Sequence, residues 1–115
     1  MNDRDALLAR IAERLKALAD PTRLKILHVL EEGERCVSEI VESVGGSQAN
    51  VSKHLSILRR AGLVDCRRRG LNVDYHVTDS TSLAICRTVC AVLEKQAAAE
   101  HREIKRARAA SGGFA

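Results

Sequence analysis

The stretch from Ser47 to Val77, SQANVSKHLSILRRAGLVDCRRRGLNVDYHV, constrains the fold more than any other part of the chain. Its first half has apolar residues at helical spacing, at Val51, Leu55 and Leu58. Its second half has two β-prone runs, 64–68 and 73–77, joined by a glycine-containing turn that follows three consecutive arginines. The sequence therefore predicts a helix followed by a basic hairpin, a module suited to placing a helix in a DNA groove and holding the phosphates beside it.

The positive charge of the chain is concentrated in this module. The formal net charge of the 115 residues is +4. Residues 47–70 carry six Lys and Arg against one Asp, or +5, whereas residues 1–46 carry seven against nine, or −2. This distribution favours a phosphate-binding face, and the aromatic content of 2% argues against stacking on single strands. A merely solvated charged surface, or a protein-contact module of the same fold, remains the alternative.

The other segments predict packed helices without a linker or repeat. We expect helices at 5–18, 21–31, 36–44, 47–62 and from 79 or 80 to about 109, and strands at 64–68 and 73–77. One helical stripe of the first helix holds Leu7, Leu8, Ile11, Leu15 and Leu18, and the residues of the second helix expected to face inward are Leu24, Leu27 and Leu30. In the second strand, Asp74 and His76 are expected to be exposed. The predicted fold is mainly α with a small β-hairpin: a winged helix-turn-helix domain over 1–110, with five helices and a two-stranded wing, and a flexible tail at 111–115.

The candidate DNA contacts lie on the polar front of the fourth helix and in the hairpin. A Gln in the first turn can pair with adenine, and Lys53 can reach guanine or phosphate. The arginines of the hairpin suit phosphate or minor-groove contacts, and His54 is interpreted as structural or DNA-proximal. The predicted set is Gln48, Ala49, Ser52, Lys53, Ser56, Arg67, Arg68 and Arg69.

The N-terminus MNDRDALLARIAERL is charged and has no apolar core of a signal peptide. No apolar run approaches the length of a membrane span. We therefore expect a cytoplasmic protein without a membrane partner, whose four cysteines are reduced thiols.

Three strings together resemble the ArsR/SmtB family of metal- and metalloid-responsive winged-helix repressors. They are ALADPTRLKILHVL, GERCVSEIVESVGGSQANVSKHLSILRRAGLV and RRRGLNVDYHV, over about residues 17–77. The resemblance implies a homodimer held by the first and last helices, which binds a double-stranded DNA operator of two half-sites and releases it when an inducer binds. It also implies base contacts at Gln48, Ala49, Ser52 and Lys53, although Ala49 replaces the commoner Ser of the family.

The family's usual effector sites are incomplete in this chain. Its arsenite sensors often carry a Cys-x-Cys pair at the start of the third helix, where this chain has Cys36 and Ser38. Its zinc sensors often use ligands on the last helix, and of the matching positions only Asp79 could serve.

The last helix offers another pair of thiols. Cys86 and Cys90 are four residues apart and so share one helical face. Thiolates select soft ions, which favours As(III), Sb(III) or another soft metal ion as inducer, with Cys36 as the third ligand. The competing interpretation makes Cys86 and Cys90 small apolar residues of a buried stripe with Leu83 and Leu93.

Two further functions compete with a metalloid-responsive repressor. A redox or persulfide signal could instead crosslink Cys36 to Cys86 or Cys90. A thiol enzyme is disfavoured, because no Cys–His–carboxylate arrangement and no glycine-rich phosphate loop is recognisable. Cys66, beside the arginines, is interpreted as incidental.

Overall fold

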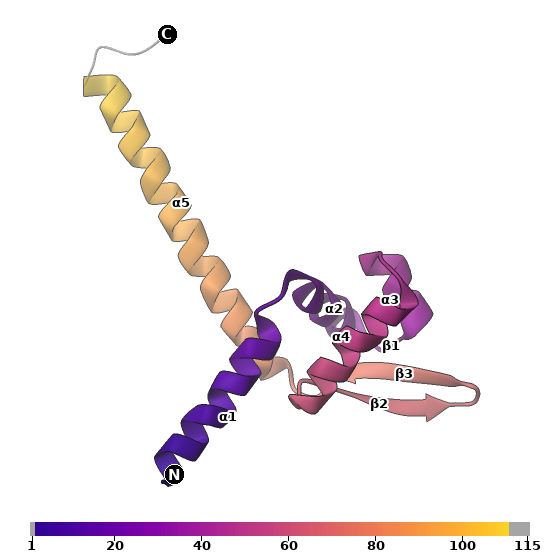
Figure 1. Ribbon diagram of the computed structural model, residues 1–115. Coiled ribbons are helices and arrows are strands. Elements are labelled where there is room, and N and C mark those ends of the chain that lie inside the picture. The colour runs from indigo at the N-terminus through magenta and orange to yellow at the C-terminus, as the bar shows by residue number, and fades with distance from the viewer. Residues whose placement is uncertain (1, 111–115) are drawn as a thin grey trace. The chain divides into compact units, whose positions relative to one another are not determined.

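The computed structural model describes residues 2–110, except for the side chains of residues 81 and 82 (Figure 1). The predicted flexible tail at 111–115 lies outside the described residues. Within the described range there are five α-helices, a three-stranded sheet and one 3₁₀ turn. Their bounds are α1 Asp3–Leu18, α2 Pro21–Glu32, β1 Arg35–Cys36, α3 Val37–Val44, α4 Gln48–Arg60, β2 Val64–Arg69, β3 Asn72–Val77, η1 Ser80–Leu83 and α5 Ala84–Ala110.

The chain divides into two compact units, Met1–Ser80 and Thr81–Ala115. The first unit holds α1 to α4 and the sheet, and the second holds α5. The predicted winged helix-turn-helix elements are confirmed, since α3, a tight turn, α4 and the β2–β3 hairpin follow one another in the expected order.

Short polar side chains and glycines fix the ends of the helices. The Asp20 carboxylate accepts a hydrogen bond from the backbone N–H of Arg23 at 3.0 Å, and Pro21 begins α2. The Ser47 hydroxyl accepts from the backbone N–H of Asn50 at 3.0 Å and so caps α4. Between α3 and α4, Gly45 adopts a positive φ of 81°, a backbone conformation that side chains disfavour.

The core of the first unit is aliphatic and lies between α2, α3, α4 and the sheet. Its fully buried side chains are Ile26, Leu27, Ile40, Val51, Leu55, Leu58, Leu63 and Val64. The expectation that Leu24 faces inward is wrong, because it is 38% exposed. The buried face of α2 is formed by Ile26, Leu27 and Leu30, and Leu24 lies to one side of it.

A short strand that was not predicted from the sequence precedes α3. β1 pairs antiparallel with β3, which gives the order β1-β3-β2, and Cys36 lies opposite Asp74. Cys36 is therefore not the first residue of the helix, as expected, but its N-cap, with an extended backbone at φ −81° and ψ 168°. A two-residue strand carries no periodic signal, so only its pairing with β3 reveals it.

The hairpin places Arg67 opposite Asp74 and Arg69 opposite Asn72. Gly70 opens the two-residue loop with φ 62°, as a type II′ turn requires. The expectation that Asp74 is exposed is wrong: the residue is 6% exposed. β3 is the central strand, with β1 on one side and β2 on the other, and the Arg69 side chain covers the Asp74 carboxylate.

Helices α1 and α5 each expose large apolar side chains in the described part of the chain. The apolar stripe predicted on α1 is buried only at Leu18, and α5 has no buried residue. The large exposed apolar residues of the two helices are Leu7, Leu8, Ile11, Leu15, Ile85, Val89, Val92, Leu93 and Ile104. None of the helices in the described part of the chain has the length and apolar character needed to cross a membrane.

Candidate nucleic-acid interface and thiol residues

The front of α4 is a continuous polar surface. The five helix residues predicted to contact DNA are all exposed, namely Gln48, Ala49, Ser52, Lys53 and Ser56. The opposite side is anchored by Val51, Leu55 and Leu58, each with 0% exposure. The helix therefore offers small and polar side chains on one face while the other is fixed in the core, as a recognition helix requires.

A buried histidine joins α4 to the start of α2. His54 is 8% exposed, and its Nδ1 lies 3.2 Å from Nη1 of Arg23. Arginine has only donors, so Arg23 donates this hydrogen bond and His54 Nδ1 accepts it. The Arg23 guanidinium also donates to the backbone oxygen of Ala17 at 2.7 Å, at the end of α1. The burial of His54 and its bond with Arg23 therefore support a structural role for this residue.

Two of the three consecutive wing arginines are held by carboxylates. Arg67 forms a two-pronged ion pair with Glu34, with Nε to Oε2 at 3.2 Å. Arg69 forms another with Asp74, with Nε to Oδ2 at 2.6 Å. The hydrogen bond and then the charge of Arg69 lower the pKa of Asp74, outweighing its burial. No such partner of Arg68 is found among the described residues.

Cys36 occupies the start of α3. Its backbone N–H donates to the Glu39 carboxylate at 3.1 Å, a bond that lowers the pKa of Glu39. Its half-buried sulfur lies 3.2 Å from the Ser38 hydroxyl oxygen. The family's arsenite sensors often have a second thiol at the position of Ser38. In this chain that position is in contact with the Cys36 sulfur but carries a hydroxyl oxygen.

Cys86 and Cys90 lie in the second unit. Both are free thiols of α5; Cys86 is half-buried and Cys90 is exposed, with its thiol 3.7 Å from the Glu94 carboxylate. Within residues 2–110, no group of three or more His, Cys, Asp or Glu side chains is arranged to hold a metal ion. The three-thiol set of Cys36, Cys86 and Cys90 stays a prediction, as its members belong to different units.

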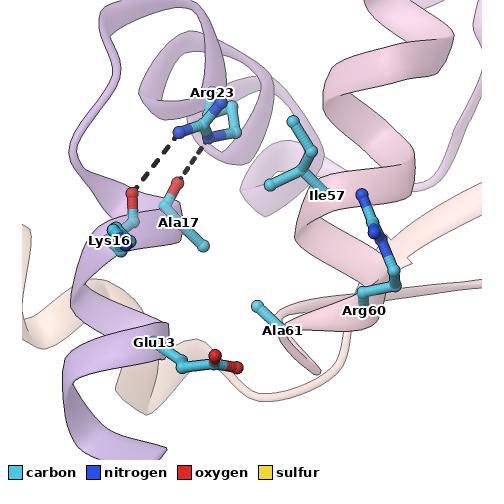
Figure 2. Close-up of a pocket in the computed structure, with 7 residues that line it drawn as sticks. All are labelled: Glu13, Lys16, Ala17, Arg23, Ile57, Arg60 and Ala61. Carbon is cyan, nitrogen blue, oxygen red and sulfur yellow. Dashed lines mark hydrogen bonds between the residues drawn. The ribbon is translucent and has the colours of Figure 1, made fainter. Parts of the chain in front are cut away.

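An open cavity of about 300 Å³ lies between α1, α2 and α4 (Figure 2). Figure 2 shows the Arg23 side chain turned back toward the carbonyl groups of Lys16 and Ala17. The lining residues are Glu13, Lys16, Ala17, Arg23, Ile57, Arg60 and Ala61. Cys36, the candidate thiol of this unit, is not among the residues that line the cavity.

Comparison with known proteins establishes the family. Residues 20–65 match the family model for bacterial regulatory proteins of the arsR family. The chain is 40% identical over 81 residues to an uncharacterised HTH-type transcriptional regulator of Methanocaldococcus jannaschii, an alignment that covers 70% of this chain and 91% of the relative. The chain belongs to the ArsR family.

Other relatives of this ArsR-family chain include a probable mercury resistance operon repressor of Streptomyces lividans, 50% identical over 68 residues. That alignment covers 59% of this chain and 54% of the relative, so the chain spans about half of that protein. Among solved structures, a homodimeric winged helix-turn-helix DNA-binding domain from Mycobacterium bovis matches with a TM-score of 0.73 and 34% identity, over 84% of this chain and 90% of that one.

These relatives confirm the predicted family and fold. Regulators of this family bind DNA through the winged helix-turn-helix and are not enzymes, which removes the thiol enzyme considered above. The roles of individual residues at the DNA and thiol sites stay predictions.

The two carboxylates that hold the wing arginines were not predicted from the sequence. Asp74 could have been found by counting residues around the Gly70–Leu71 turn, because the register places it on the same face as Arg67, directly opposite, and as Arg69, its diagonal neighbour. Glu34 carries no such signal, since it lies 33 residues from its partner.

Proposed function

We propose that this protein is a homodimeric transcriptional repressor that leaves its DNA operator when As(III), Sb(III) or another soft metal ion binds Cys36, Cys86 and Cys90. The observation that carries the DNA-binding part is the exposed polar face of α4 over its buried apolar side. Gln48 in the first turn reads a base edge, and Ser52 and Lys53 continue the contact along the groove.

The uncovered apolar faces of α1 and α5 support the homodimer. Residues such as Ile11 and Val89 are about half exposed in the single chain, and large apolar patches commonly mark interfaces. The related Mycobacterium bovis domain is homodimeric. A dimer with twofold symmetry presents two copies of α4 to two half-sites of an operator.

The chemistry of the thiols supports a soft inducer. Trivalent arsenic binds thiolates, and Cys86 and Cys90 are free and one helical turn apart on α5. The Streptomyces relative is named a probable mercury resistance operon repressor, and mercury is also a soft metal that binds thiols. We assign the third thiolate to Cys36, at the start of the helix that precedes the recognition helix.

Release follows from a shift between two states of the dimer. Inducer binding at thiols on α3 and α5 favours a state in which the two recognition helices no longer match the spacing of the half-sites. The inducer must therefore bind the free repressor more tightly than the DNA-bound form. A cytoplasmic location belongs to the same proposal, because thiols stay reduced there.

The test is release of an operator obtained by selection from random duplexes with the purified, reduced protein. Arsenite should release the operator from the unmodified protein and from Cys66→Ser, the matched control. Cys36→Ser and the double variant Cys86→Ser/Cys90→Ser should bind the operator normally but fail to release it. Full arsenite response in the double variant would overturn the assignment of the site.

The same assay separates the redox alternative from metalloid sensing. Persulfide is added in place of arsenite, without reductant, and the protein is then analysed by mass spectrometry. Release by persulfide alone, with a crosslink from Cys36 to Cys86 or Cys90, would replace the metalloid inducer with a redox signal.

A further inference from the structure

We propose that Arg68 is the wing arginine that contacts operator DNA, whereas Arg67 and Arg69 are positioning residues that fix the wing. This inference rests on the proposed DNA binding and assigns different roles to three consecutive residues of the same type. Three observations support it: the ion pairs of Arg67 and Arg69, the strand register that puts Arg68 on the other face of the hairpin, and the net charge left on residues 47–70.

Arg67 ties the wing to the loop between α2 and β1. Its Nε and Nη2 both donate to the Glu34 carboxylate. The same carboxylate lies 3.9 Å from Nδ1 of His76 on β3. The pair bridges two segments 33 residues apart in sequence. A DNA phosphate that bound Nε and Nη2 of Arg67 would displace Glu34 and would then face that uncompensated carboxylate.

Arg69 is committed within the hairpin itself. Its guanidinium meets both oxygens of Asp74, whose side chain is only 9% exposed. If Arg69 turned to a DNA phosphate instead, the buried Asp74 carboxylate would lose its counterion, which costs stability. The Arg69–Asp74 pair therefore holds β2 to β3 next to the turn.

Arg68 differs from both neighbours in direction and in partners. Successive side chains of a strand point to opposite faces of the sheet, so Arg68 lies on the other face from Arg67 and Arg69. It is exposed, lies opposite Val73, and has no ion pair among the described residues. Its full charge is available to a phosphate.

The net charge presented to DNA is correspondingly smaller than the sequence suggests. Residues 47–70 hold six cations, of which three are paired: Arg59 with Asp65, Arg67 with Glu34 and Arg69 with Asp74. Six cations less the three partner carboxylates leave +3 rather than +5. In the described structure, the unpaired cations of this stretch are Lys53, Arg60 and Arg68.

The salt dependence of DNA binding measures this division of roles. The affinity falls as salt rises, and removing one cation that neutralises a phosphate makes the slope of log K against log salt shallower by about 0.9. On a mixed-sequence DNA duplex, Arg68→Ala should therefore make this slope shallower by about 0.9 for each bound protomer. Arg67→Ala and Arg69→Ala should leave it unchanged, whatever they do to thermal stability. An equal fall of the slope in either of these two variants, or an unchanged slope in Arg68→Ala, would overturn the assignment.

A gain of binding tests the same point without depending on a weakened fold. Glu34→Gln removes the carboxylate that holds Arg67, so this variant should bind the duplex more tightly and with a steeper slope, by up to about 0.9 per protomer. The matched control is Glu32→Gln, an equal change of charge at the exposed end of α2. Identical binding by these two variants would contradict the role given to the Arg67–Glu34 pair.

Failure of this inference is distinguishable from failure of the proposed function. If the unmodified protein binds no duplex in a salt-dependent manner, the DNA-binding proposal itself is wrong. If the unmodified protein binds but the slope falls equally in the three arginine variants, only the assignment to Arg68 is wrong.

Discussion

The Arg23 guanidinium donates a hydrogen bond to Nδ1 of His54, across 3.2 Å, and thereby joins the first turn of α2 to the centre of the recognition helix. The same guanidinium holds the backbone oxygen of Ala17 at the end of α1. Asp20 completes the group: its carboxylate caps α2 and lies 4.0 Å from the His54 ring. One side chain thus positions three helices relative to each other in the first unit.

Replacing this side chain should destabilise the first unit. We expect Arg23→Ala to lower the free energy of unfolding by about 2 kcal/mol, because Ala17 and His54 are then left without a charged donor in a part-buried place. Urea unfolding followed by circular dichroism measures the change. Arg10→Ala, at an exposed position of α1, is the control and should change stability by less than about 0.5 kcal/mol. Equal destabilisation in the two variants would show that the Arg23 hydrogen bonds do not stabilise the fold.

Acid should weaken the wing through Asp74. The bond from Arg69 lowers the pKa of this carboxyl below its ordinary value of 3.8, so the unfolded chain takes up the proton first. The stabilisation is therefore present above pH 3.8 and is lost as the pH falls below that value toward the folded pKa. Asp74→Asn removes the titrating group, so its unfolding free energy should fall less over the same acid range. Parallel pH profiles of the two proteins would contradict the prediction.

A second thiol beside Cys36 should create a metalloid site within α3. The Ser38 oxygen lies 3.2 Å from the Cys36 sulfur, so Ser38→Cys places two thiols in contact. We expect arsenite affinity to rise about tenfold or more, because soft ions select paired thiolates. Ultraviolet absorption of the thiolate–metal bond reports the binding. Ser43→Cys, on the same helix but distant in sequence from Cys36, is the control, and an equal gain there would indicate a nonspecific effect.

A charge on the uncovered face of α1 should dissociate the proposed dimer. Ile11 is 45% exposed in the chain, so Ile11→Glu should leave the fold intact but weaken association about tenfold or more. Sedimentation equilibrium measures the dissociation constant, and operator affinity should fall with it. Ala9→Glu adds the same charge on the opposite side of the helix and should stay dimeric. Unchanged association of Ile11→Glu would place the interface elsewhere.

The sequence determined the order and type of the five helices and of the β2–β3 hairpin, because each of these carries a local signal. Asp20 with Pro21, and Ser47 after two glycines, mark helix starts that need only their own backbone to be satisfied. The hairpin followed from Gly70 and the flanking β-prone residues. The polar front of α4 was recognisable for the same reason, since helical spacing alone places Lys53 on the opposite side of the helix from Leu55.

Only the tertiary structure decided which polar groups meet. The burial of Asp74 in a strand that β1 covers on one side, the capture of Arg67 by Glu34 and the placing of Cys36 in a strand all depend on residues that are distant in sequence and come together across the sheet. Local periodicity does not predict such pairs, because the energy of an ion pair depends on the distance between the two charges in space and on the water around them. The sequence alone determined a basic wing, and folding decided that only Arg68 of its three consecutive arginines keeps an unpaired charge in the described structure.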